Sequence, residues 1–282
     1  MKNNNKLAYV SSLEINKIID DIWKDIHIDQ PNITSKTTPD AYVMGGQPGA
    51  GKSTSTNKLN AKYNGDIVIV DLDQYRERHP NYKALYEKYG KDSAEYTHEF
   101  ASKIKDSILK RAVDAKYNII IDGTLKNVNK AEKLVDNLKD NGYRVDVLIH
   151  TCPKEVSWQS VNARYENALK QGRIPRYVPK HVHDQVVEAL PTNADKLSQS
   201  KQIESLTVHN RQEKIYDSKI NKGLPSVSIQ NEINKNENKL SQDGSVKSQD
   251  DIFSKALQTA HQKIENTRSI SNEKSINKGI EI

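Results

Sequence analysis

A glycine-rich segment, GGQPGAGKST, has the residue types and spacing of a phosphate-binding loop. Gly46 to Ser53 match the pattern G-x-x-x-x-G-K-S, after an apolar run and before a helical stretch. Without a Cβ, glycines let backbone N–H groups turn toward phosphate oxygens, and the following helix adds the positive end of its dipole. Lys52 would contact the β- and γ-phosphates of ATP, and the Ser53 hydroxyl would ligate Mg²⁺. The predicted nucleotide-binding residues are Gly46, Gln47, Pro48, Gly49, Ala50, Gly51, Lys52, Ser53 and Thr54.

Acidic residues follow the next two predicted strands. Asp71 and Asp73 come after one of them, and Asp122 with Thr124 come after the other. If the alternation of the strand continued, only one of the first two carboxylates would point toward the phosphates. We expect it to be Asp73, acting as the base that takes the proton of an attacking hydroxyl. Asp122 could orient metal-bound water or contact the acceptor, and both roles stay open.

Three arginines follow the fourth predicted strand. Arg164 lies on a predicted helix, and Arg173 and Arg176 lie in a Gly/Pro-punctuated segment. We expect about residues 171–180 to form a lid whose closure brings planar guanidinium donors onto the transferring phosphoryl group.

Strands that alternate with helices position these groups. Apolar β-branched runs predict strands at 41–44, 66–71, 117–124, 144–152 and 203–210, and the spacing of isoleucines predicts a helix over 13–28. This order predicts an α/β fold of the P-loop NTPase type, a parallel sheet with helices on both faces. Ligands bind beyond the carboxyl ends of such strands, where the glycine loop and the acids would meet.

The amino-acid composition changes after residue 212. The segment 213–282 is rich in Asn, Lys, Ser and Gln, which is typical of a polar, poorly ordered tail. We therefore expect one kinase domain over 1–212, followed by this tail with a short helix at about 252–264.

Composition narrows the function classes. The net charge of +6 suits anionic ligands, but no basic stripe indicates nucleic acid. No signal peptide or membrane-spanning run is found, and the lone Cys152, expected to be buried, fits a reducing cytoplasm. His79, His98 and His183 lack metal-ligand spacing and are expected to be structural or solvated.

Together these motifs resemble the zeta toxins, the kinases of toxin–antitoxin systems. The resemblance covers about residues 10–212. Its motifs, in family order, are GGQPGAGKS, IVIVDLDQYRERHPNY, YNIIIDGT, RYE, PKHVHD, LPTN and NR.

The resemblance implies ATP- and Mg²⁺-dependent phosphorylation of UDP-N-acetylglucosamine at the 3′-hydroxyl of the amino sugar, and a small antitoxin that blocks the nucleotide site. It assigns Asp73 as the base, Lys52 and Ser53 to ATP and Mg²⁺, and Arg164 and Arg176 to the phosphates. The substrate-binding residues it implies are Asp73, Asp106, Asp122, Thr124 and Lys126.

Three acceptor-side positions differ from the family pattern. Asp122 and Asp106 stand where glutamates are usual, and Lys126 stands where an arginine is typical. Lysine lacks the bidentate geometry of arginine. Two alternatives therefore stay open: a P-loop kinase acting on another small-molecule or nucleic-acid hydroxyl, and a non-catalytic module that uses ATP to hold a partner.

Overall fold

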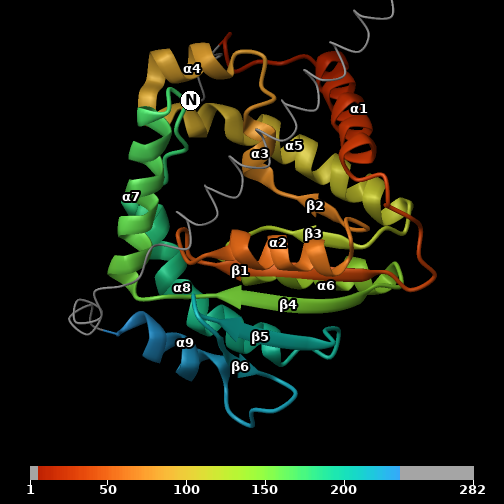
Figure 1. Cartoon of the computed structure of the whole chain (residues 1–282), viewed down its shortest axis with the longest axis vertical. Coiled ribbons are helices and arrows are strands. Elements are labelled where there is room, and N and C mark those ends of the chain that lie inside the picture. The colour runs from red at the N-terminus through yellow and green to blue at the C-terminus, as the bar shows by residue number, and fades with distance from the viewer. Residues whose placement is uncertain (1–5, 236–282) are drawn as a thin grey trace, which may run out of the picture. The chain divides into compact units, whose positions relative to one another are not determined.

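Within residues 6–235, the part of the chain that the computed structural model describes, six strands form one central sheet (Figure 1). The strands are β1 Asp40–Gly46, β2 Val68–Val70, β3 Ile119–Ile121, β4 Arg144–His150, β5 Ser205–His209 and β6 Lys214–Asp217. The helices are α1 Ser12–Asp29, α2 Lys52–Lys62, α3 Leu72–Arg76, α4 Tyr82–Tyr89, the 3₁₀ turn η1 Gly90–Asp92, α5 Ser93–Asp114, α6 Val128–Asp140, α7 Lys154–Lys170, α8 Lys180–Ser198 and α9 Pro225–Ile233.

The strand order is β2-β3-β1-β4-β5-β6, and all neighbours are parallel except β5 and β6. β1 pairs with β3 on one side and β4 on the other, so Val43 lies between Ile121 and Val147. Crossover helices connect the parallel strands, as the sequence predicted, and the α/β fold class is confirmed. The carboxyl ends of β1, β2 and β3 therefore lie at one edge of the sheet.

The two faces of the sheet bury different amounts of apolar surface. Ala41 and Val43 point into a large core with residues of α1, α5, α6 and α8. The alternate residues Tyr42 and Met44 point into a small core against α2. Successive side chains of a strand alternate between faces, so β1 is buried on both and reads as an unbroken apolar run.

The first helix follows its sequence pattern closely. Helix α1 begins after Ser11, whose side chain accepts a hydrogen bond from the Glu14 backbone N–H at 3.2 Å. Ile15, Ile19 and Ile22 recur on one face of the helix and are buried. This face packs in the large core, as its helical periodicity predicts.

The compact unit extends beyond the boundary at 212 that the sequence suggested, and it ends at Lys235. β6 pairs with β5, and Tyr216, Ile229 and Ile233 are buried in the large core. The polar composition around these few apolar residues hid a strand and a helix. The expected helix at 252–264 lies outside the described residues.

A long helix, α8, also lies where the sequence suggested only short motifs. It contains Pro191 in its interior, which interrupts the usual helix signal. The stretch between Lys170, the last residue of α7, and Lys180, the first of α8, has no regular structure. It covers the residues predicted to act as a lid and is called the lid below.

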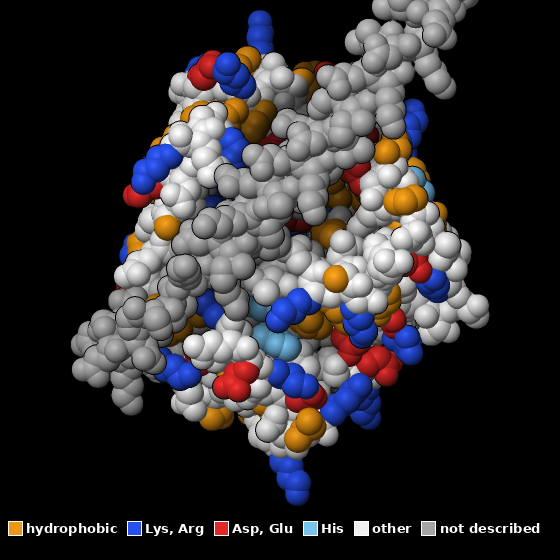
Figure 2. All heavy atoms as spheres, viewed as in Figure 1, with side chains coloured by type: hydrophobic (Ala, Val, Ile, Leu, Met, Phe, Trp, Pro, Cys, Tyr) orange, Lys and Arg blue, Asp and Glu red, His pale blue; other side chains and the backbone are white. Residues whose placement is uncertain are grey.

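Surface charge is mixed on the face drawn in Figure 2, where Lys and Arg side chains alternate with Asp and Glu across the described part. The described helices include none with the length and apolar character to cross a membrane.

Because α9 belongs to the compact unit, substitution of one of its buried side chains should lower the stability of the fold. Ile229 on α9 is fully buried, whereas Val227 on the same helix is 60% exposed. Ile229→Ala should lower the free energy of unfolding by about 2–5 kcal/mol, because it removes buried methyl groups and leaves a cavity. Val227→Ala should change it by less than about 0.5 kcal/mol. Denaturant unfolding measures both, and equal small effects would show that α9 does not belong to the folded unit.

Candidate active site

The glycine loop lies between β1 and α2 in a form suited to an anion. Gly46, Gly49 and Gly51 have φ angles of +130°, +84° and +96°, which other residues rarely adopt. A Cβ at Gly46 would lie 2.0 Å from the carbonyl oxygen of His150, so only glycine fits. Helix α2 begins at Lys52 without a side-chain cap, which leaves its first N–H groups for a phosphate.

Lys52 is the first residue of α2, directly after this loop. Its Nζ donates a hydrogen bond to the Gly46 carbonyl at 3.1 Å. Burial lowers the pKa of Lys52, and the positive charges of Arg176 and Arg164 lower it further, against the opposing effect of acidic neighbours. The groups whose charges act on this lysine are Asp122, Arg176, Arg164 and Asp73. The predicted catalytic side chains therefore lie close enough to Lys52 for their charges to act on it.

The two acids after β2 do not continue the strand. β2 ends at Val70, and the Asp71 side chain caps α3 by accepting a hydrogen bond from the Asp73 backbone N–H at 2.9 Å. Strand alternation therefore does not decide which acid faces the site, contrary to the sequence expectation. Burial raises the pKa of Asp71, and the carboxylates of Asp122 and Asp73 raise it further.

Asp73 is held by two arginines. Arg76 Nε donates to Asp73 Oδ1 at 2.9 Å, and Arg176 of the lid forms an ion pair with Asp73 Oδ2. Arg76 is itself fixed, because it donates to the Ala94 carbonyl at 2.5 Å and to Thr97 Oγ1 at 3.0 Å. The sequence analysis gave Arg76 no role, although its spacing of three residues after Asp73 is an available signal.

The third strand end contributes a carboxylate and a loop. Asp122 Oδ1 is buried and has no hydrogen-bond partner among the described residues. The Thr124 carbonyl accepts a hydrogen bond from the Gly46 backbone N–H at 3.3 Å, which joins this loop to the phosphate loop. Asn193 Nδ2 donates to the carbonyls of Leu125 and Lys126 at 2.8 and 3.0 Å, and so fixes the same loop to α8.

Other predicted substrate residues lie less deeply. Lys126 is exposed, and its Nζ donates to Gln185 Oε1 at 2.5 Å. Asp106 is exposed on α5, and within the described chain no ion pair connects it to the arginines of the site. Arg164 is exposed on α7, and its positive charge is one of those that lower the pKa of Lys52.

His150, to which the sequence analysis assigned no role, lies beside the phosphate loop. His150 lies at the end of β4, and its Nε2 is 2.7 Å from Ser55 Oγ of α2. Burial, followed by the charges of His209 and Lys52, lowers the pKa of His150 to about 3, so the ring is neutral at physiological pH. Cys152 is buried, as expected, and burial raises the pKa of its thiol.

A strand that runs directly into such a loop, beside a second strand end that supplies a carboxylate, is the architecture of the P-loop kinases, and this chain is a phosphotransferase of that class. The family model described as Zeta toxin matches residues 24–221, well over half of the sequence. The chain belongs to the zeta toxin family.

Individual relatives agree with this family. Toxin PezT of Streptococcus pneumoniae serotype 4 is 37% identical over 189 residues, which are 66% of this chain and 75% of the relative. Toxin zeta of Streptococcus agalactiae is 27% identical over 232 residues, 81% of each chain. A solved structure from a study of the PezAT chromosomal toxin–antitoxin system of Streptococcus pneumoniae superposes with a TM-score of 0.72 and 30% identity, over 80% of this chain and 89% of that one.

The raised pKa of Asp71 predicts a pH-dependent gain in stability. Ionisation of Asp71 is unfavourable in the folded state, and this penalty vanishes at acidic pH, where Asp71 is protonated both folded and unfolded. Asp71→Asn keeps the helix cap and removes the charge. The melting temperature should rise at neutral pH, by roughly 2–4 °C for each kcal/mol gained, and the gain should fade as the pH falls.

The exposed acid Asp92 supplies the control, because Asp92→Asn changes charge without relieving a buried carboxylate cluster. Melting curves of both variants across the acidic and neutral range make the comparison. A gain for Asp71→Asn that persisted unchanged in acid would contradict the assigned cause.

Proposed function

We propose that this protein phosphorylates the 3′-hydroxyl of the amino sugar of UDP-N-acetylglucosamine with ATP and Mg²⁺, as the toxin of a toxin–antitoxin pair. The observation that carries the proposal is the position of Asp73, held by Arg76 and Arg176 at the rim where Lys52 and the phosphate loop lie. Membership of the zeta toxin family supports the class of acceptor and the toxic role.

The proposed base is Asp73. A carboxylate at this place would accept the proton of the attacking hydroxyl as its oxygen bonds to the γ-phosphorus, while the bond from that phosphorus to the bridging oxygen breaks and ADP leaves. Arg176 pairs with Asp73 from a segment without regular structure, and it would exchange the carboxylate for phosphate oxygens when the nucleotide binds. Arg76 stays with Asp73 because its other N–H groups are held by α5, and it orients the carboxylate.

The nucleotide would be held by the loop backbone, Lys52 and the start of α2. Lys52 regains a favourable environment for its charge when phosphates approach, since burial and arginines lower its pKa in the free protein. The Ser53 hydroxyl is a hard oxygen donor that fits Mg²⁺, and Asp122, whose Oδ1 has no hydrogen-bond partner among the described residues, would orient water bound to the ion. The ion would neutralise charge on the β- and γ-phosphates.

The acceptor would lie between Asp73 and the loop after β3. Asp122 and Thr124 are the proposed contacts to the sugar nucleotide there, with Lys126 and Asp106 toward the outside. The proposed protein partner is a small antitoxin, because the solved relative belongs to a toxin–antitoxin system.

A second acceptor class is supported by one observation. Lys126 is engaged by Gln185, and Asp106 is exposed, so two of the three residues that depart from the family pattern make no buried contact in the site. A kinase for another hydroxyl compound would keep the ATP side and differ at these positions.

Mass spectrometry of candidate acceptors separates these functions. The protein is incubated with ATP, Mg²⁺ and, in separate reactions, UDP-N-acetylglucosamine, UDP-glucose and a 5′-hydroxyl oligonucleotide. A phosphoryl group added to UDP-N-acetylglucosamine alone supports the proposal. Transfer to another compound alone would assign the second acceptor class, and ATP binding without transfer to any acceptor would indicate a binding module.

Substitution of the proposed base gives a direct kinetic prediction. Asp73→Asn should lower kcat by about 10²–10⁴-fold, the usual contribution of a general base, while binding of a non-hydrolysable ATP analogue persists. Asp20→Asn, which breaks an exposed ion pair with Arg111, should change neither quantity. Near-full phosphorylation by Asp73→Asn would remove Asp73 from this role.

Toxicity should depend on the phosphate loop. Lys52→Ala should weaken binding of the ATP analogue and abolish growth inhibition when the protein is expressed in bacteria. Lys58→Ala, an exposed lysine on the same helix, should remain toxic. Equal toxicity of the two variants would separate growth inhibition from nucleotide binding.

A further inference from the structure

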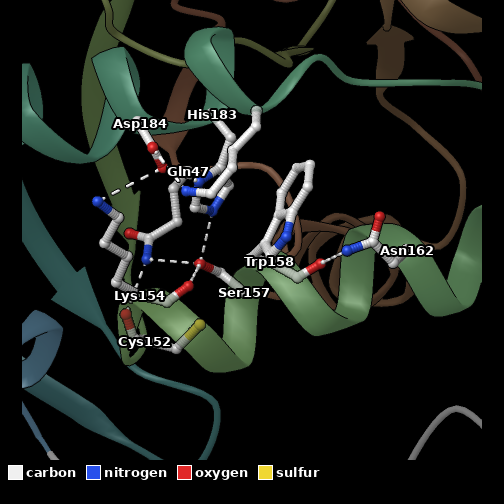
Figure 3. Close-up of polar contacts among 9 residues, drawn as sticks. Gln47, Cys152, Lys154, Ser157, Trp158, Asn162, His183 and Asp184 are labelled. Atoms are coloured by element: carbon white, nitrogen blue, oxygen red, sulfur yellow. Dashed lines mark hydrogen bonds and ion pairs between the residues drawn. The ribbon is translucent and has the colours of Figure 1, made fainter.

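A buried chain of hydrogen bonds leads from the phosphate loop to the helix after the lid. Gln47, the second residue of the loop motif, is fully buried. Its Nε2 donates to the Cys152 carbonyl at 2.7 Å and to Ser157 Oγ at 3.2 Å (Figure 3). Its Oε1 accepts from Thr151 Oγ1 at 3.1 Å. The side chain of Gln47 therefore points away from the ligand side and into the junction of β4 and α7.

The chain continues from α7 to α8. Ser157 Oγ is 2.8 Å from His183 Nε2, and His183 Nδ1 is 3.0 Å from Asp184 Oδ1 (Figure 3). Lys180 and His183 hold the pKa of Asp184 below its usual value, so its carboxylate accepts and Nδ1 carries a proton. The Ser157 hydroxyl donates its one proton to the Lys154 carbonyl at 2.7 Å, and the same oxygen accepts from Gln47 Nε2 and lies within hydrogen-bond distance of His183 Nε2.

The Ser–His–Asp order invites comparison with a hydrolase triad, but the burial of its members excludes that role. Ser157 and His183 are both fully buried. Ser157 Oγ is already surrounded by Gln47, His183 and the Lys154 carbonyl, the last at 2.7 Å. No substrate carbonyl can reach this oxygen, so the arrangement holds structure rather than attacks a substrate.

Ser157 also supports the loop through its backbone. A Cβ at Gly49 would lie 2.3 Å from the Ser157 carbonyl oxygen, so the loop backbone rests on the first turn of α7. Arg211 also links the loop to α7, because it donates to the Gly49 carbonyl and to Ser160 Oγ, both at 2.6 Å. The shape of the phosphate loop therefore depends on where the first turn of α7 lies.

The same helices flank the lid. α7 ends at Lys170, α8 begins at Lys180, and Arg176 lies on the segment between them. His183 lies in the first turn of α8, where the lid rejoins the fold. Its bond to Ser157 fixes that end of the lid to the turn on which the phosphate loop rests.

We propose that His183 is a positioning residue of the nucleotide site. Through Ser157 and Gln47 it holds the loop in its phosphate-binding shape, and through α8 it fixes the base of the lid that carries Arg176. The inference rests on the nucleotide site of the proposed function and does not depend on the identity of the acceptor.

The test compares nucleotide affinity with stability in the full chain. His183→Leu should raise the dissociation constant of a Mg²⁺-bound, non-hydrolysable ATP analogue by about tenfold or more. His183→Gln should restore much of the affinity, because the amide group can form hydrogen bonds to Asp184 and to Ser157 in place of the two ring nitrogens. His181→Leu, at an exposed position on the same helix, should bind as the unsubstituted protein does.

Ser157→Ala provides a second route that does not place a new side chain in the core. It should weaken analogue binding to a similar extent as His183→Leu, and the double variant should be no weaker than the worse single variant, because both remove one shared contact. A melting temperature measured without nucleotide shows that each variant is folded.

Four outcomes would overturn the inference. Unchanged affinity in folded His183→Leu and Ser157→Ala, or fully additive losses, would show that His183 does not position the loop. A fall in melting temperature with normal affinity of the folded fraction would assign it a role in stability alone. Failure of the unsubstituted protein to bind the analogue would overturn the proposed function as well, which separates the two claims.

Discussion

The ion pair between Asp73 and Arg176 joins the two parts of the site. Asp73 belongs to the segment after β2, and Arg176 belongs to the lid between α7 and α8. The pair is partly shielded, with Asp73 17% and Arg176 37% exposed, so each charge needs a partner. In the free protein the lid arginine neutralises the proposed base, and phosphate is the competing partner that arginine geometry also fits. Nucleotide binding would therefore release the carboxylate for the acceptor.

This exchange requires a site in which opposite charges balance before the ligand binds. Acidic side chains follow β2 and β3, and basic ones come from the start of α2, from α7 and from the lid. Burial lowers the pKa of Lys52 and raises that of Asp71, so dehydration disfavours both charges. A polyanion would compensate the basic side chains, and its metal ion would compensate the acidic ones. In the proposed function, a nucleotide with Mg²⁺ would relieve these unfavourable electrostatics of the free site.

Much of the architecture follows from local sequence signals. The glycine pattern placed the loop between β1 and α2, unbroken apolar runs placed the parallel strands, and the Gly/Pro-punctuated arginines placed the irregular segment before α8. Asp71 was predicted to continue the strand, but it caps a helix that starts one residue after it. α9 was missed because its two buried isoleucines stand among polar residues.

The supporting contacts of the site could not be predicted in the same way. Gln47 and Ser157 are 110 positions apart, and His183 lies a further 26 positions along the chain. Hydrogen bonds between such distant residues leave no periodicity in the sequence, so His183 could only be expected to be structural or solvated. Arg76 differs, because its pairing with Asp73 is local and follows helical spacing.

The most direct measurement is a crystal structure with a non-hydrolysable ATP analogue, Mg²⁺ and UDP-N-acetylglucosamine bound together. The account predicts that the 3′-hydroxyl of the amino sugar lies within about 2.6–3.2 Å of an Asp73 carboxylate oxygen. It also predicts that Arg176 leaves Asp73 for the γ-phosphate while Arg76 stays. A sugar bound with this hydroxyl remote from Asp73, and Arg176 still paired with the carboxylate, would contradict the account.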